Sequence, residues 1–293
     1  MLHIRLITAF LLSALLIYCV SFATQPWITQ LLFMTSIVLS GTEFIALRWH
    51  TIGGHSHTEF PRPPLKKEHF LVGLAYAMVL PADFFGRASI LSEAEGSLPA
   101  VLAWITVCTV GGSAFLYRRE MNLDNATQKL MNALAGFLYI AIPGLLMYRL
   151  SEMSIPEAPR GSALYFSLAI VLMGDSGAYF SGRLFGKTPL IPKVSPKKTV
   201  EGAMGGLGFS ALSAVVLASW FNFPFGILTS AFVGLIAGCA GQIGDLAESA
   251  IKRSANCKDS GNLLPGHGGV LDRVDALLFG VPITYLACLL LIG

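Results

Sequence analysis

The sequence predicts an all-α protein, a polytopic transmembrane helix bundle of about nine spans with its N-terminus in the cytoplasm. Hydrophobic residues make up 54% of the 293 residues, charged residues make up only 13%, and the mean hydropathy is +0.66. An average soluble domain carries roughly 25% charged residues. Half that fraction cannot solvate the surface of a globule of this size. Lipid must therefore be the solvent, and the membrane bilayer is the first expected partner.

Nine apolar runs are long enough to cross a bilayer. A hydrocarbon core about 30 Å thick needs roughly 20 apolar residues in a helix. The first run also resembles a signal peptide that ends in small residues, but a retained span fits the charge pattern better. The runs cover residues 4–22, 27–47, 69–87, 98–117, 131–150, 161–182, 202–221, 224–251 and 274–292.

Basic residues separate onto one side of this predicted membrane. With nine spans, 17 of the 20 Lys and Arg residues fall on the side of the N-terminus, which leaves Arg87, Arg149 and Arg160 on the other side. Loops rich in Lys and Arg stay in the cytoplasm. We therefore expect a multi-pass protein of a bacterial inner (plasma) membrane, whose two richest basic loops face the nucleotide pool. The net charge of +3 is too small to indicate a nucleic-acid partner.

Acidic residues within the late spans are the first candidates for function. A charge at the centre of a span costs roughly 3 kcal/mol or more, so such residues are rarely incidental. Asp175 lies near the end of the sixth span, Asp245 and Glu248 lie in the eighth, and Asp272 and Asp275 open the ninth. From residue 171 onward polar residues are frequent within the spans, whereas the spans before residue 160 contain few of them.

The spacing of these acids predicts a divalent cation site. Asp245 and Glu248 share one face of a helix, and Asp272 and Asp275 share another. Two such faces that meet near the cytoplasmic surface would repel each other, and Mg²⁺, a hard cation that prefers oxygen ligands, removes that repulsion. Salt bridges are the alternative, Glu248 to Lys252 or Asp272 to a neighbouring arginine. Asp245 has no base near it in the sequence.

The basic loops supply positive charge that could bind a phosphate group beside the predicted cation. Ser195-Pro196-Lys197-Lys198-Thr199 leads into the seventh span, and free N–H groups at a helix start favour an anion. Lys197 and Lys198 add charge, and Thr199 is placed to cap the helix. A juxtamembrane basic patch that only sets topology is the alternative.

Two glycine-containing motifs suggest other sites. The segment from Gly182 to Thr188 approaches a P-loop, but it has three residues between its glycines where that motif has four, and no strand precedes it. We reject that reading. In Gly266-His267-Gly268-Gly269 the glycines let the backbone approach a phosphate, and His267 either donates to the phosphate or orders the loop.

The residues from Ser249 to Asp275 read SAIKRSANCKDSGNLLPGHGGVLDRVD. This stretch resembles the signature of the phosphatidate cytidylyltransferases, also called CDP-diacylglycerol synthases, through its Lys-Arg, Lys-Asp, His-Gly-Gly and Asp-Arg-x-Asp positions. GDSGAYFSGRLFGK (174–187) and PKVSPKKTVEG (192–202) also resemble the family. Before residue 160 the resemblance is faint.

The resemblance implies a multi-span helical fold, a requirement for Mg²⁺ with K⁺ as a candidate second cation, and the reaction of CTP with phosphatidate to give CDP-diacylglycerol and diphosphate. It implies that residues 161–293 form the catalytic transmembrane domain with cytoplasmic basic loops, and that residues 1–160 are supporting or lipid-facing spans. A homodimer is a candidate assembly.

The expected site residues fall into three groups. The metal residues are Asp245 and Asp272, with Glu248 and Asp275 as further candidates. The catalytic residues are Asp245, Asp272, Lys252 and Arg253. The substrate-binding residues are Ser195, Lys197, Lys198, Thr199, Lys258, His267, Arg273, Asp175 and Tyr179.

Two rival functions remain open. One is a related lipid enzyme: a CTP-dependent kinase for polyprenol or phytol, or a cytidylyltransferase for another lipid phosphate. It remains open because apolar spans do not determine which acyl or prenyl chain the substrate carries. The other is an ion or metal transporter, since acids inside a membrane also mark ion paths. The clustering of acids with bases on one side of the membrane favours chemistry there over transport.

Overall fold

The structure is a computed structural model that describes residues 14–22, 26–52, 65–88, 98–120, 122–264 and 268–292. Within these residues, eight helical stretches are long and apolar enough to cross a membrane. The prediction of a polytopic helix bundle is confirmed, and these stretches correspond to the second to ninth predicted spans. Residues 4–13 of the first predicted span lie outside the described residues, and its end includes the π-helical turn η1 (Tyr18–Phe22). The stretches are Trp27–Ile52, Lys67–Phe85, Ala100–Arg118, Leu123–Glu152, Ser162–Phe185, Val200–Trp220, Ile227–Ser254 and Leu271–Ile292.

The chain divides into two compact units, each built from segments that are distant in the sequence. Unit 1 comprises mainly Pro26–Leu145 and Ser254–Asp272, and unit 2 comprises mainly Leu146–Arg253 and Arg273–Gly293. The assignment of residues 161–293 to a catalytic domain and of residues 1–160 to supporting or lipid-facing spans stays a prediction.

In unit 1, helix α2 (Pro26–Ile52) packs against α3 (Lys67–Ala77) and α7 (Leu123–Gly136). Small residues permit the first contact, because a Cβ atom added to Gly73 would lie 2.5 Å from the main-chain oxygen of Val38. Asn122 caps α7 by accepting from the amide of Asp124 at 2.9 Å. The unit also contains α4 (Val79–Ala88), α6 (Leu98–Arg119) and the π-helical turn η2 (Phe137–Ala141).

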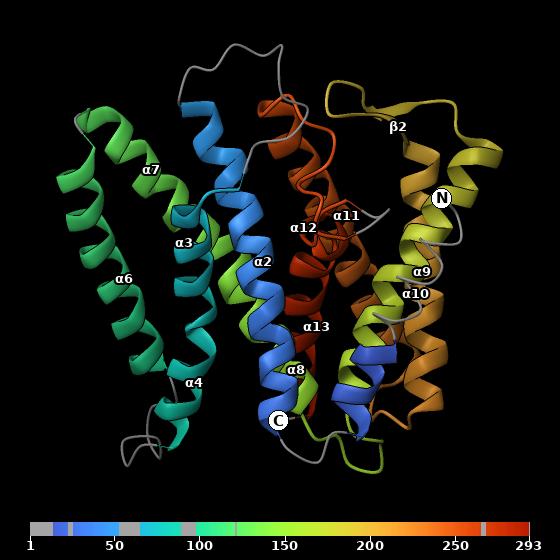
Figure 1. The fold of residues 1–293 in the computed structure, drawn as a ribbon. Coiled ribbons are helices and arrows are strands. Elements are labelled where there is room, and N and C mark those ends of the chain that lie inside the picture. The colour runs from blue at the N-terminus through green and yellow to red at the C-terminus, as the bar shows by residue number, and fades with distance from the viewer. Residues whose placement is uncertain are drawn as a thin grey trace. The chain divides into compact units, whose positions relative to one another are not determined.

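In unit 2, helices α9 (Ser162–Phe185) and α10 (Val200–Trp220) lie side by side (Figure 1). Each presents a small residue at every fourth position, which lets two membrane helices approach closely. A Cβ atom added to Gly202 would lie 3.1 Å from Cα of Gly182, and one added to Gly206 would lie 2.9 Å from the oxygen of Gly174. The facing positions are Gly174, Ala178 and Gly182 on α9 and Gly202, Gly206 and Ser210 on α10.

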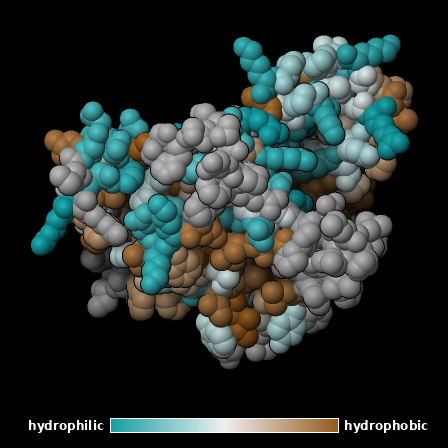
Figure 2. All heavy atoms as spheres, turned by 45° about the horizontal axis from the view of Figure 1, so that its top comes forward, coloured by the Kyte–Doolittle hydropathy of each residue, from teal (hydrophilic) through white to brown (hydrophobic). Residues whose placement is uncertain are grey.

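A short antiparallel hairpin connects α9 to α10, a feature that the predicted loop did not include. Its strands are β1 (Pro189–Ile191) and β2 (Ser195–Thr199), and the amide of Val194 closes the turn on the oxygen of Ile191 at 3.1 Å. Thr199 caps α10 as predicted, because its hydroxyl accepts from the amide of Gly202 at 3.2 Å. Hydrophilic side chains gather over this end of unit 2 (Figure 2).

The rejection of a P-loop at Gly182–Thr188 agrees with the hydrogen bonds of this connection. A P-loop offers its main-chain N–H groups to phosphate. Here the amides of Lys187 and Thr188 donate to the carboxylate of Glu201, at 3.0 and 3.2 Å. Glu201 thereby fixes the start of the hairpin against the first turn of α10.

Helix α11 (Ile227–Ser254) corresponds to the eighth predicted span and runs for 28 residues, which is longer than a bilayer requires. Its glycines lie at close contacts with neighbouring segments. A Cβ atom added to Gly234 would lie 2.6 Å from the oxygen of Ser210 on α10, and one added to Gly244 would lie 2.6 Å from the oxygen of Asp275. The predicted ninth span is broken at Asp275 and Ala276 into α12 (Leu271–Val274) and α13 (Leu277–Ile292).

Candidate functional site

A cavity of about 500 Å³ that several charged and polar residues line lies in unit 2, among α9, the hairpin, α10 and α11. Five of the predicted substrate-binding residues line it, together with Asp245. Cations and carboxylates therefore face the same space, which suits a phosphorylated ligand accompanied by a metal ion. The polar and charged lining residues are Asp175, Tyr179, Arg183, Lys197, Lys198, Thr199, Gln242 and Asp245.

Lys198 and Asp245 form an ion pair beside this cavity. The Lys198 Nζ atom lies 2.5 Å from Oδ2 of Asp245, and each side chain is 30% exposed. Asp245 therefore has a basic partner, although none is near it in the sequence, because β2 carries Lys198 to it from 47 residues away. Ser249 lies one turn further along α11, and its hydroxyl is 3.5 Å from Oδ1 of Asp245.

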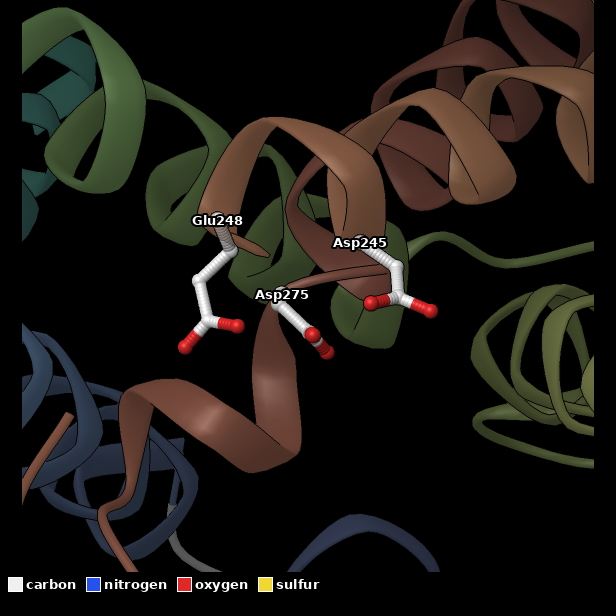
Figure 3. A group of neighbouring side chains, drawn as sticks. All are labelled: Asp245, Glu248 and Asp275. Carbon is white, nitrogen blue, oxygen red and sulfur yellow. The ribbon is translucent and has the colours of Figure 1, made fainter. Parts of the chain in front are cut away.

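Three carboxylates converge next to this pair. Asp245, Glu248 and Asp275 each offer an oxygen atom, and these atoms all lie within 4.8 Å of one another. Figure 3 shows Asp245 and Glu248 leaving α11 on the same side, with Asp275 between them from the break between α12 and α13. Gly244 makes this meeting possible, because its missing side chain lets the backbone of Asp275 approach α11.

The three oxygens fit a hard divalent cation. Carboxylate oxygens are the ligands that Mg²⁺ prefers, and it is usually bound by one or two carboxylates together with substrate phosphates. The cluster lies beside the cavity that Asp245 lines, so phosphate oxygens in the cavity could complete such a site. Glu248 and Asp275, predicted as further ligands, belong to this cluster.

Lys252 and Arg253, at the end of α11, have different partners. Lys252 forms an ion pair with Glu248, one turn earlier, and the Glu248 side chain is fully buried. The salt bridge considered for Glu248 is thus present. Arg253 reaches the hairpin turn, where its Nε donates to the main-chain oxygen of Val194 at 3.4 Å. Both residues therefore support the shape of the site, and their predicted contacts with phosphates stay predictions.

Asp272 stands at the start of α12, where its carboxylate orders the signature segment of unit 1. It accepts from the amides of Ser260 at 2.9 Å and Gly269 at 2.8 Å. Gly268 adopts a φ of 84°, in the region that favours glycine, so the turn before α12 depends on this residue type. The assignment of Asp272 to a metal stays a prediction.

The other residues predicted to bind substrate differ in how exposed they are. Ser195 opens β2 and is half-buried, whereas Lys258 and Arg273 are exposed. The Tyr179 hydroxyl accepts from Arg183 at 3.1 Å, at the rim formed by α9. His267 lies outside the described residues.

Sequence reasoning missed three residues of interest. Arg183 and Gln242 line the cavity. Arg183 is one of the 17 basic residues on the predicted cytoplasmic side, and it lies within the stretch 174–187 that resembles the family. Glu43 is fully buried in α2 and contacts the signature segment. Its signal was available, since it is an acid inside a span, the same criterion that selected Asp245.

This fold and site define a multi-pass membrane enzyme for phosphorylated substrates. The chain belongs to the cytidylyltransferase family, whose model matches residues 3–291. It is 33% identical to a phosphatidate cytidylyltransferase of Bacillus subtilis (strain 168) over 220 residues, which cover 73% of this chain and 76% of that relative. It is 44% identical over 126 residues to a phosphatidate cytidylyltransferase of Synechocystis, and 43% identical over 129 residues to one of Staphylococcus haemolyticus. Those two alignments cover 43% of this chain and, respectively, 43% and 50% of the relatives.

Proposed function

We propose that the protein is a phosphatidate cytidylyltransferase, a nucleotidyltransferase of phospholipid biosynthesis that converts CTP and phosphatidate into CDP-diacylglycerol and diphosphate. The observation that carries the proposal is the cavity of unit 2, which Lys197, Lys198 and Arg183 line together with Asp245, a member of the acidic cluster. Membership of the cytidylyltransferase family and the names of the three relatives support the same activity.

The reaction is a displacement at phosphorus. A phosphate oxygen of phosphatidate forms a bond to the α-phosphorus of CTP, and the bond from that phosphorus to the bridging oxygen breaks. Diphosphate leaves with the electron pair of the broken bond. The lipid phosphate is an anion near pH 7, so no base is needed to create the nucleophile. The barrier lies in bringing two polyanions together, and positioned positive charge lowers it.

The residues of unit 2 have matching tasks in this proposal. Lys197, Lys198 and Arg183 bind and orient the phosphates of CTP. Asp245, Glu248 and Asp275 hold Mg²⁺, which supplies positive charge against the phosphates when it is bound. Asp175, Tyr179 and Ser195 position the substrate. Asp272 as a metal ligand, K⁺ as a second cation and a homodimer remain predictions from the sequence.

A radiolabel assay tests the activity and separates it from the rival lipid enzymes. Purified protein is mixed with Mg²⁺ and CTP labelled at either the α- or the γ-phosphorus, and it is offered phosphatidate, other lipid phosphates, or the alcohols polyprenol and phytol. We expect the label in a CDP-lipid, with phosphatidate as the best acceptor. Transfer of a γ-label to polyprenol or phytol would instead identify a kinase. Ion flux through the protein in vesicles, unaffected by CTP, would favour the transporter.

Arg183 provides a specific prediction for nucleotide binding. Arg183→Gln keeps a polar side chain but removes the guanidinium that lines the cavity. Because a hydrogen bond to a charged group contributes about 1.5–3 kcal/mol, we expect the KM for CTP to rise about tenfold or more. Steady-state kinetics at saturating phosphatidate measure this value. Lys193→Gln, exposed in the hairpin turn outside the cavity, is the matched control and should keep the KM of the wild type.

We also propose that the cavity opens on the cytoplasmic side, which the asymmetry of Lys and Arg supports. A single cysteine at Lys193, in a variant without the five native cysteines, reports the side of the hairpin. We expect a membrane-impermeant thiol reagent to label it in inverted inner-membrane vesicles and not in intact spheroplasts. Labelling in spheroplasts would place the hairpin on the opposite side.

A further inference from the structure

Helix α2 carries a buried carboxylate in unit 1. Glu43 is 0% exposed, and it lies in a helix long and apolar enough to span a membrane. A charge in such a place is costly unless it is paired or hydrogen-bonded, and such residues are candidates for function. None of the site residues predicted from the sequence is near Glu43 in the chain.

Three donors from the signature segment bind this carboxylate. Oε2 of Glu43 accepts from the Ser260 hydroxyl at 3.1 Å and from the amide of Leu271 at 2.9 Å. Oε1 accepts from the amide of Val270 at 3.2 Å. Hydrogen bonds to an ionised acceptor are stronger than neutral ones. Glu43 therefore connects Ser260 to Val270 and Leu271, which all lie more than two hundred residues further along the chain.

The space around the carboxylate leaves no room for other side chains. A Cβ atom added to Gly269 would lie 2.5 Å from Oε2 of Glu43, and one added to Gly261 would meet Oε1. These glycines are needed because the carboxylate fills the space next to them. Arg48, further along α2, also contacts this part of unit 1, since its guanidinium donates to the Ser254 hydroxyl at 3.1 Å.

Ser260 couples Glu43 to Asp272. Its hydroxyl donates to Glu43, while its amide donates to the carboxylate of Asp272. Gly269 adds a second connection, because its amide also donates to Asp272 and its Cα lies against Glu43. The position of the Asp272 side chain therefore depends on the carboxylate at position 43.

We propose that Glu43 is a positioning residue for cytidylyl transfer, which fixes the signature segment around Ser260 and Gly269 and thereby orients Asp272. The proposal rests on the proposed function. A merely structural role predicts loss of folded protein with normal turnover in the molecules that remain folded. A positioning role predicts a fall in kcat at nearly constant KM for CTP, because the CTP cavity described above is in unit 2.

The test uses the full-length protein in detergent micelles with Glu43→Gln, which keeps the size of the side chain and removes its charge. We expect kcat per folded molecule to fall about 30-fold, as for the loss of charged hydrogen bonds, with the KM for CTP within about twofold of the wild type by the same argument. Asp83→Asn, a buried acid of α4 in the same unit, is the matched control and should keep the wild-type kcat.

Hydrogen–deuterium exchange gives a readout that needs no activity. Amides of Val270 and Leu271 should exchange faster in Glu43→Gln, whereas those of α9 and α10 should not change. Ser260→Ala, which removes one donor, covers the case in which Glu43→Gln fails to fold. It should lower kcat several-fold, and in combination with Glu43→Gln its effect should be less than additive.

The outcomes separate this inference from the proposed function. Wild-type kcat and unchanged exchange in Glu43→Gln would overturn the positioning role, and so would a wild-type kcat in Ser260→Ala. A wild-type protein without transferase activity would instead overturn the proposed function. In that case the exchange measurement still decides whether Glu43 holds the signature segment.

Discussion

Asp245→Asn is expected to reduce turnover by about 10³-fold or more, because a metal-assisted displacement loses a ligand and the charge that holds the cation. Asp245 is the residue that belongs to both the cavity and the acidic cluster. Asparagine keeps the shape of the side chain, and the site is partly exposed, so we expect the variant to fold and insert. Transfer of labelled CMP from CTP to phosphatidate measures the loss.

Two further measurements make this prediction specific. Asp124→Asn, an exposed acid in the first turn of α7, removes the same charge elsewhere and should leave turnover unchanged. Glu248→Asp and Asp275→Asn should raise the Mg²⁺ concentration needed for half-maximal activity. Wild-type turnover in Asp245→Asn would remove this residue from the metal site and would leave the cavity without its proposed partner for Mg²⁺.

The spans, and most of the polar and charged residues that line the cavity, could be predicted from local sequence patterns. Hydropathy predicts the spans because a bilayer imposes a minimum apolar length on a helix. The small residues of α9 and α10 recur at helical spacing, which is typical of closely packed membrane helices. The helical face that joins Asp245 and Glu248 follows from their separation of three residues. Asp275 was predicted as a further ligand, and the structure places it in the cluster.

Other features depend on contacts between distant segments, which local patterns do not define. The pairing of Lys198 with Asp245 needs the hairpin, and a separation of 47 residues sets no distance between them. The break at Asp275 and Ala276 is not marked by Pro or Gly. Glu43 was different, since its position inside a span should have selected it.

Lys252 provides the second large effect, which concerns stability. Its ammonium is paired with Glu248, and the exposed fractions of the two side chains are 12% and 0%. Removing one partner of a buried ion pair leaves the other charge without compensation and destabilises a protein by about 3–5 kcal/mol. Lys252→Met keeps the length of the side chain and its apolar stem. We therefore expect the free energy of unfolding, measured by denaturant titration in micelles, to fall by about this amount.

A double variant separates the ion pair from other effects of the substitution. Glu248→Gln combined with Lys252→Met removes both charges, so it should recover most of the stability that Lys252→Met alone loses. Its turnover should stay low, because Glu248 also belongs to the acidic cluster. Lys258→Met, at an exposed position of the signature segment, should leave the free energy of unfolding within about 0.5 kcal/mol of the wild type. A double variant no more stable than Lys252→Met would show that the lysine stabilises α11 through something other than Glu248.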